Sequence, residues 1–158
     1  MSKQHHYATT ITWTGNKGEG TTRYDAYERA HTLSVTDKPD ILCSSDTPFR
    51  GEASKHNPED MLLAALSSCH MLWYLHLCAD AGIIVTAYTD HATGVMEQTP
   101  DGGGHFKEVM LHPVVTITDP TMIDKAIVLH NGAHNKCFIA NSVNFPVRHV
   151  PECLIQQH

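Results

Sequence analysis

The sequence predicts a single α+β domain over residues 1–158. Stretches rich in β-forming residues alternate with two helical stretches, and clusters of Gly, Pro and Asp separate them. The length suits one compact domain, and a hydrophobic content of 41% is enough for a core. The expected order is an N-terminal β-hairpin, a buried central helix, a second β-hairpin, a helix and a final strand.

The first hairpin is expected within residues 7–35. Residues 7–14 and 21–35 are rich in β-formers, and the GNKGEG segment between them holds three glycines. Residues 36–56 contain DKPD, SSD and TPFRG, which indicate a long loop with a strand fragment in it.

The central helix should begin at Asn57, because Asn is a good N-cap and Pro58 suits the first helical position. Gly82 is a plausible stop. Apolar positions recur at three- and four-residue spacing, namely Leu62, Ala65, Leu66, Cys69, Leu72 and Trp73. Other faces of the helix are apolar as well, through Met61, Leu63, Met71, Tyr74, Leu75 and Leu77. Since few other elements exist to cover such a helix, we expect an intertwined homodimer.

The second half of the chain predicts another hairpin, a helix and a strand. Residues 83–96 and 105–118 read as two strands around a PDGGG turn, with Pro113 marking an edge or bulge. The Asp-Pro pair at 119–120 opens a helix that Gly132 is expected to bend or end. Residues 142–150 are typical of a last strand.

Composition excludes several classes of protein. The formal charge is −6 and the 11 Lys and Arg are scattered, so no nucleic-acid surface is expected. No uninterrupted apolar run reaches the roughly 18 residues of a membrane span, and the N-terminus lacks the apolar core of a signal peptide. Five cysteines without tight spacing argue against a secreted disulfide scaffold and favour a reducing cytoplasm.

Two of the cysteines have settings that suit redox chemistry. Cys69 lies on the apolar stripe of the central helix, where a thiol is more often a core residue unless a cation, most plausibly an arginine, favours its thiolate. Cys137 lies near a helix end, beside Lys136. Cys78 is nine residues from Cys69, so the two face opposite sides of one helix. Cys43 and Cys153 are interpreted as incidental thiols in a loop and a tail.

Thirteen histidines require a metal site to be weighed. His130, His134 and Cys137 are spaced to share a helical face. However, Gly132 interrupts that face, and neither H-E-x-x-H nor a paired C-x-x-C motif is present. We therefore expect no functional metal.

Three segments resemble the OsmC/Ohr family of organic hydroperoxide reductases. NPEDMLLAALSSC, with Cys69 ten residues after Glu59, resembles the family signature, and AHNKCFIANS resembles its second-cysteine segment. WTGNKGEGTT is similar to the family's glycine-rich first hairpin. The resemblance implies an OsmC-like fold and covers most of the chain.

The resemblance also implies an activity, that of a dithiol-dependent peroxidase without a cofactor. Cys69 would attack an organic hydroperoxide and become a sulfenic acid, and Cys137 would then close a disulfide with it. An external dithiol, in that family often a lipoylated protein, would reduce the pair. A small hydrophobic peroxide is the expected substrate, in a pocket formed by Leu66, Leu72, Trp73 and Phe138.

The resemblance also implies two further site residues, an acidic one and an activating arginine. Glu59 lies roughly 15 Å from Cys69 along one helix, so it would reach the site from the partner subunit or else only complement the helix N-terminus. The family has an activating arginine near the hairpin glycines, where this chain has Lys17. Arg23 and Arg29 are the nearest candidates, and Arg29 is preferred. The alternative function is a non-catalytic dimer of the same fold that senses oxidation or binds a ligand or metal.

Overall fold

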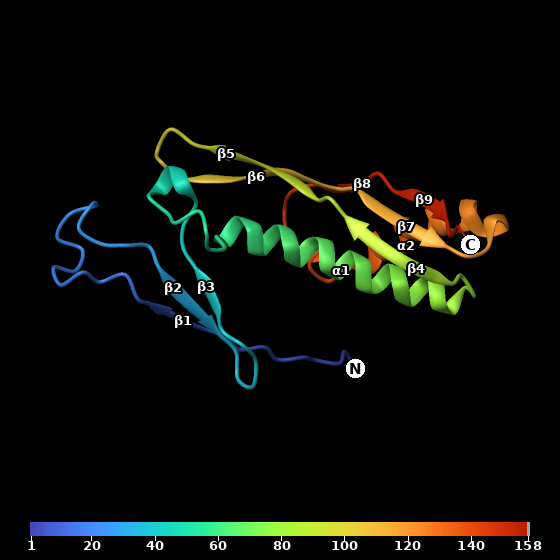
Figure 1. Cartoon of the computed structure of the whole chain (residues 1–158), viewed down its shortest axis with the longest axis horizontal. Coiled ribbons are helices and arrows are strands. Elements are labelled where there is room, and N and C mark those ends of the chain that lie inside the picture. The colour runs from blue at the N-terminus through green and yellow to red at the C-terminus, as the bar shows by residue number, and fades with distance from the viewer. Residues whose placement is uncertain (158) are drawn as a thin grey trace. The chain divides into compact units, whose positions relative to one another are not determined.

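The computed structural model describes residues 1–157, which divide into two compact units, Met1–Met61 and the chain from Leu62 onward (Figure 1). The first unit contains one antiparallel sheet in the order β1-β2-β3. Its strands are β1 (Thr10–Trp13), β2 (His31–Ser34) and β3 (Ile41–Cys43), and the short 3-10 helix η1 (Thr47–Phe49) follows. The predicted first hairpin and strand fragment are therefore present, with shorter strands.

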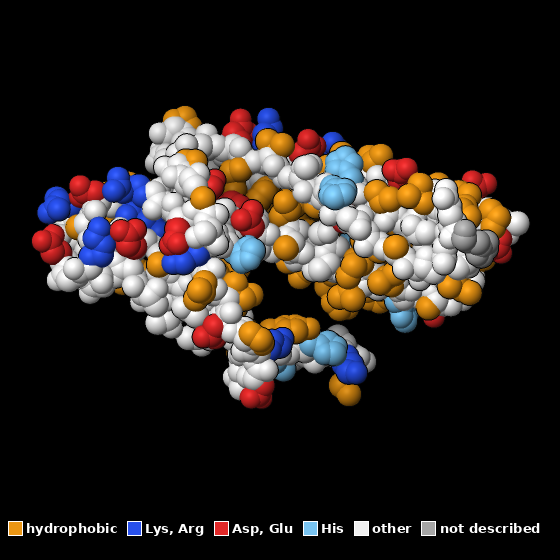
Figure 2. Space-filling view, in the orientation of Figure 1, with side chains coloured by type: hydrophobic (Ala, Val, Ile, Leu, Met, Phe, Trp, Pro, Cys, Tyr) orange, Lys and Arg blue, Asp and Glu red, His pale blue; other side chains and the backbone are white. Residues whose placement is uncertain are grey.

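The connection between β1 and β2 is held by local polar contacts rather than by a longer ladder. Lys17 Nζ lies 3.2 Å from Glu28 Oε1, and Arg23 Nε lies 3.2 Å from Asp25 Oδ1. Charged side chains of both signs gather over this connection in Figure 2. These exposed pairs are each worth about 1 kcal/mol or less.

Helix α1 (Pro58–Asp80) begins and ends where the sequence predicts. The Asn57 Oδ1 atom accepts the Asp60 N–H at 2.8 Å, which is an N-cap, and Gly82 adopts a φ of 73° just after the last turn. By length and composition alone α1 could cross a membrane, a test that core helices of soluble proteins also pass.

The second unit contains two three-stranded sheets, in the orders β4-β7-β9 and β5-β6-β8. The strands are β4 (Val85–Asp90), β5 (Thr93–Gln98), β6 (Gly104–Leu111), β7 (Pro113–Ile117), β8 (Val147–His149) and β9 (Glu152–Ile155). The β4–β7 and β5–β6 pairs are antiparallel, whereas β6–β8 and β7–β9 are parallel.

Each of the two long strands expected in residues 83–118 is in fact two strands. Strand β6 ends at Leu111 and β7 begins at Pro113. Proline has no N–H to donate, so it does not continue the hydrogen-bond ladder of β6. The Asp90 carboxylate holds the corresponding corner after β4, since it accepts the Ser67 hydroxyl at 2.5 Å and the His112 N–H at 2.7 Å.

The C-terminal elements differ from expectation in two places. After η2 (Pro120–Met122), helix α2 (Ile123–Lys136) runs through Gly132 without ending there. A Cβ at Gly132 would lie 3.1 Å from Leu77 Cδ1, so glycine permits the close approach of α2 to α1. The sequence analysis also missed β9, which places Cys153 in a half-buried strand rather than in a tail. Cys43, expected in a loop, is buried in β3.

The core of the second unit forms on a different stripe of α1 from the predicted one. The four buried residues of α1 are Leu66, His70, Tyr74 and Cys78, one per turn. Leu66 packs with Val109 and Leu111 of β6, and Tyr74 and Cys78 pack with Val115 and Ile117 of β7. The predicted stripe through Cys69 and Leu72 lies beside this face and stays largely outside the core.

Apolar side chains on the surface of the second unit predict self-association. Leu72, Ile84 and Phe138 are 62%, 63% and 62% exposed, and hydrophobic side chains are visible over this unit in Figure 2. Burying them in a second copy would be favourable by about 25 cal/mol per Å². We expect a homodimer by light scattering, and a stable monomer at micromolar concentration would contradict this.

Candidate functional site

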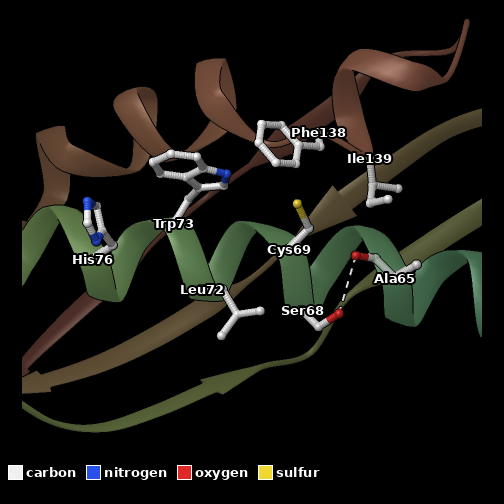
Figure 3. Close-up of a pocket in the computed structure, with 8 residues that line it drawn as sticks. All are labelled: Ala65, Ser68, Cys69, Leu72, Trp73, His76, Phe138 and Ile139. Carbon is white, nitrogen blue, oxygen red and sulfur yellow. Dashed lines mark hydrogen bonds between the residues drawn. The ribbon is translucent and has the colours of Figure 1, made fainter. Parts of the chain in front are cut away.

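A mostly apolar cavity of about 520 Å³ opens beside the middle of α1 in the second unit. Its lining residues come from α1 and from the segment after α2, namely Ala65, Ser68, Cys69, Leu72, Trp73, His76, Phe138 and Ile139 (Figure 3). In that view the Cys69 sulfur points toward the segment that carries Phe138 and Ile139. The reactive atom of Cys69 therefore belongs to the cavity wall.

Cys137 directly precedes Phe138 of this wall, and the Cys69 thiol is close enough to influence its pKa. Cys137 is the C-cap of α2, where its N–H donates to the His134 carbonyl at 3.3 Å, and its thiol is 1% exposed. Burial, and after it the neighbouring Cys69 thiol, raise the pKa of the Cys137 thiol to about 11. The structure thus brings together the two sulfurs that the sequence singled out, with unequal environments.

Three of the four residues predicted to form the pocket line it, and one does not. Leu72, Trp73 and Phe138 face the cavity, whereas Leu66 is fully buried in the core with Val109. The prediction missed four other lining residues, which are Ala65, Ser68, His76 and Ile139. His76 lies four residues after Leu72, so extending the stripe by one more turn would have found it.

Aromatic and basic side chains form the end of the cavity away from Ser68. The Trp73 and Phe138 rings meet edge to face at 5.8 Å, and the Lys136 ammonium lies 5.4 Å from the Trp73 ring centroid. His76 Nε2 lies 3.3 Å from Asp80 Oδ2. These contacts hold Trp73 in place against the cavity.

Glu59 and the candidate arginines belong to the first unit. One carboxylate oxygen of Glu59 is buried without a hydrogen-bond partner among the described residues. Arg29 lies over the rings of Tyr24 and Tyr27, and its guanidinium donates to their carbonyl oxygens at 2.6 and 2.5 Å. Arg23 is an exposed partner of Glu19 and Asp25.

A cluster of histidines, which the sequence analysis did not anticipate, packs α1 against α2 and β8. His70 and His130 are each 1% exposed and are joined by a 3.0 Å hydrogen bond, and the His149 ring lies 5.3 Å from His70. Burial, reinforced by neighbouring histidines, lowers the pKa of His70 to about 4 and that of His130 to about 3. Across residues 1–157, no group of three or more His, Cys, Asp or Glu side chains is placed to hold a metal ion.

The family of the chain follows from its sequence and its fold together. The model of the OsmC-like protein family matches residues 51–151, which include α1, both site cysteines and β8. The chain belongs to the OsmC family. The resemblance noted in the sequence and the predicted α+β fold class are therefore confirmed. No curated protein matches the sequence.

Solved structures of other OsmC-like proteins share the fold of this family member. An OsmC-like protein of unknown function from Vibrio cholerae is 31% identical with a TM-score of 0.80, over 94% of this chain and 99% of that one. An organic hydroperoxide resistance protein OsmC from Legionella pneumophila is 20% identical with a TM-score of 0.66, over 96% and 99%. An organic hydroperoxide resistance protein from Elizabethkingia anophelis is 16% identical with a TM-score of 0.69, over 99% and 100%.

Proposed function

We propose that this OsmC-family protein is a thiol peroxidase that reduces organic hydroperoxides to alcohols. The observation that carries the proposal is the Cys69 thiol in the wall of an apolar cavity, next to the buried Cys137 whose pKa it helps to raise. Membership of a family that includes organic hydroperoxide resistance proteins supports the same activity.

The two cysteines take different roles because their surroundings differ. Cys69 is half-buried and faces the cavity, so a peroxide can approach its sulfur. Cys137 is buried and has a raised pKa, so it stays a thiol and does not compete for the peroxide. We therefore assign Cys69 as the nucleophile and Cys137 as the resolving cysteine.

The reaction oxidises sulfur and reduces the peroxide by two electrons. The Cys69 thiolate attacks the distal oxygen, so that the S–O bond forms, the O–O bond breaks and an alcohol leaves. Cys137 then attacks the Cys69 sulfur and closes a disulfide, which protects Cys69 from further oxidation. An external dithiol in a reducing cytoplasm, such as that of a lipoylated protein, restores both thiols by exchange.

The lining of the cavity favours an apolar substrate. Leu72, Trp73 and Phe138 supply most of the wall around Cys69, and the alkyl or aryl group of a hydroperoxide gains about 25 cal/mol for each Å² that it buries there. Hydrogen peroxide has no such group. The cavity should therefore select organic hydroperoxides over hydrogen peroxide.

Activation of Cys69 needs a cation, and we keep Arg29 as the proposed one. The two carbonyl bonds of Arg29 leave other N–H groups of its guanidinium available. Glu59, whose buried oxygen lacks a partner among the described residues, is proposed to orient that arginine from the other subunit of a homodimer. Each proposal depends on the dimer predicted above.

The activity is tested by peroxide consumption with dithiothreitol as the dithiol. We expect catalytic turnover of cumene hydroperoxide, with kcat/KM about 10-fold or more above that for hydrogen peroxide because of the apolar contacts. Mass spectrometry after mild oxidation should find a Cys69–Cys137 disulfide. Stoichiometric oxidation without turnover would instead support a redox sensor, and absence of any Cys69 oxidation would exclude both functions.

A further inference from the structure

The wall of the cavity opposite α1 is formed by two residues that follow α2. Phe138 and Ile139 lie across from Cys69 and Trp73 (Figure 3). Ile139 is anchored by packing against the cluster around Leu66. Phe138, in contrast, is 62% exposed and meets the Trp73 ring only edge to face, at 5.8 Å. Because so little of its side chain is packed, the position of Phe138 depends on how α2 is docked against α1.

His130 is the one large side chain that α2 buries completely. The three buried residues of this helix are Ala126, His130 and Ala133. His130 Nδ1 lies 3.0 Å from His70 Nε2, and the His130 ring stacks on Tyr74 at a centroid distance of 3.8 Å. A second hydrogen bond, from the Tyr74 hydroxyl to the Ala126 carbonyl at 3.1 Å, lies one turn farther from Phe138 along α2. Since His70 directly follows Cys69, the imidazole pair joins α2 to the part of α1 that carries the reactive sulfur.

This hydrogen bond depends on one particular nitrogen of each ring. One nitrogen must carry a hydrogen and the other a lone pair, and burial lowers the pKa of both rings, so both are neutral at pH 7. His149 and His134 lie outside the pair, because His149 Nε2 lies 3.1 Å from Asn131 Oδ1 and the His134 ring lies 5.8 Å from the His149 ring. Without the His70 nitrogen, the buried His130 Nδ1 would lack its partner, and α2 would shift to expose it.

We propose that the His70–His130 pair positions the Phe138 side of the cavity and thereby sets the preference for organic hydroperoxides over hydrogen peroxide. This inference rests on the proposed function. An organic hydroperoxide buries its alkyl or aryl group against Phe138, whereas hydrogen peroxide has no such group and needs only the Cys69 sulfur. A shift of α2 therefore slows the first reaction and leaves the second unchanged. Both histidines are positioning residues, because neither lines the cavity.

The ratio of two rate constants measures this preference. The reduced protein is mixed with cumene hydroperoxide or with hydrogen peroxide in the absence of dithiol. The second-order rate constant of Cys69 oxidation is then followed by quenching and mass spectrometry. A variant that is merely less stable loses rate with both peroxides in proportion, so its ratio does not change. Displacement of Phe138 lowers the ratio, by about fivefold for roughly 40 Å² of lost apolar contact.

Glutamine and asparagine distinguish the two nitrogens of an imidazole. Gln carries its amide nitrogen about where His carries Nε2, and Asn carries it about where His carries Nδ1; both amides can donate. Because His70 bonds through Nε2 and His130 through Nδ1, His70→Gln and His130→Asn should keep the ratio within about twofold of the wild type. His70→Asn and His130→Gln should lower it about fivefold. Any other order, including no change or an equal loss in all four variants, overturns the inference.

A double-mutant cycle tests the link between the pair and the wall. Phe138→Ala alone should lower the ratio about fivefold. In the His70→Asn background it should lower the ratio by less than a further factor of about two, because the ring has already left the wall. Effects that multiply as if independent would contradict the link and overturn the inference. If His70→Asn does not fold, His130→Gln takes its place in the cycle.

His105→Asn is the matched control, because His105 is exposed and does not line the cavity. Its ratio should equal that of the wild type, and a fivefold loss here would show that the ratio responds to any lost histidine and overturn the inference. A wild-type protein whose Cys69 does not react with cumene hydroperoxide overturns the proposed function as well. A selective wild type whose ratio is insensitive to all four substitutions overturns this inference alone.

Discussion

Between pH 7 and pH 4.5 the free energy of unfolding is expected to fall by about 5 kcal/mol, because His70 and His130 are buried as neutral imidazoles. Their pKa values in the fold are about 4 and about 3, whereas an unfolded histidine has a pKa near 6.5. The unfolded chain therefore binds more protons below pH 6.5, and stability is lost as the pH falls through this range. A loss of this size approaches the whole stability of many domains.

Guanidinium unfolding, followed by tryptophan fluorescence at several pH values, measures this loss. A double variant, His70→Leu with His130→Phe, removes both titrating rings and should reduce the pH dependence to about 2 kcal/mol or less, whatever its stability at pH 7. His105→Gln is the control, because His105 is exposed and its removal should leave the pH dependence unchanged. Equal stability of the wild type at pH 7 and pH 4.5 would contradict the assignment of buried neutral rings.

Local signals in the sequence predicted the helices well and the strand pairing poorly. The cap at Asn57 and the stop at Gly82 are fixed by backbone chemistry that a few residues carry, so both ends of α1 were predictable. The division of residues 83–118 into four strands depends on which partner each segment finds, and pairing is a tertiary property. Strand β9 is short and is defined by its pairing with β7, so no local pattern in the sequence predicted it.

The site shows the same division between local and tertiary information. Cys69 and Cys137 were predictable from their segments, and apolar periodicity found most of the cavity wall. Leu66 was wrongly predicted to line the pocket, because apolar periodicity gives the spacing of a stripe and leaves its width and centre undetermined. In the structure Leu66 belongs to the core, on the neighbouring stripe that contains His70 and Tyr74. A histidine at a core position has no sequence signature, since its burial depends on finding another imidazole from α2.

Replacement of Cys69 by alanine is expected to lower turnover of organic hydroperoxide by about 10³-fold or more, since it removes the reacting atom. Among the five cysteines, Cys69 alone lines the cavity. The loss should appear in kcat/KM, measured by hydroperoxide consumption with dithiothreitol, and the variant should remain folded because Cys69 is only half-buried. Cys137→Ala should also stop efficient turnover, but by a different route: Cys69 still oxidises once and then proceeds to sulfinic acid.

Cys153→Ala provides the control of the same chemical type. Cys153 is also half-buried, but it lies on β9 beside the hydrophobic cluster that contains Cys78, away from the cavity. Burial raises the pKa of its thiol, so it should react slowly with peroxide. Turnover within about twofold of the wild type is expected for this variant. A comparable loss of turnover in Cys153→Ala and Cys69→Ala would show that activity depends on the integrity of the fold rather than on the thiol in the cavity wall. Residual catalysis in Cys69→Ala would show that another residue is the nucleophile.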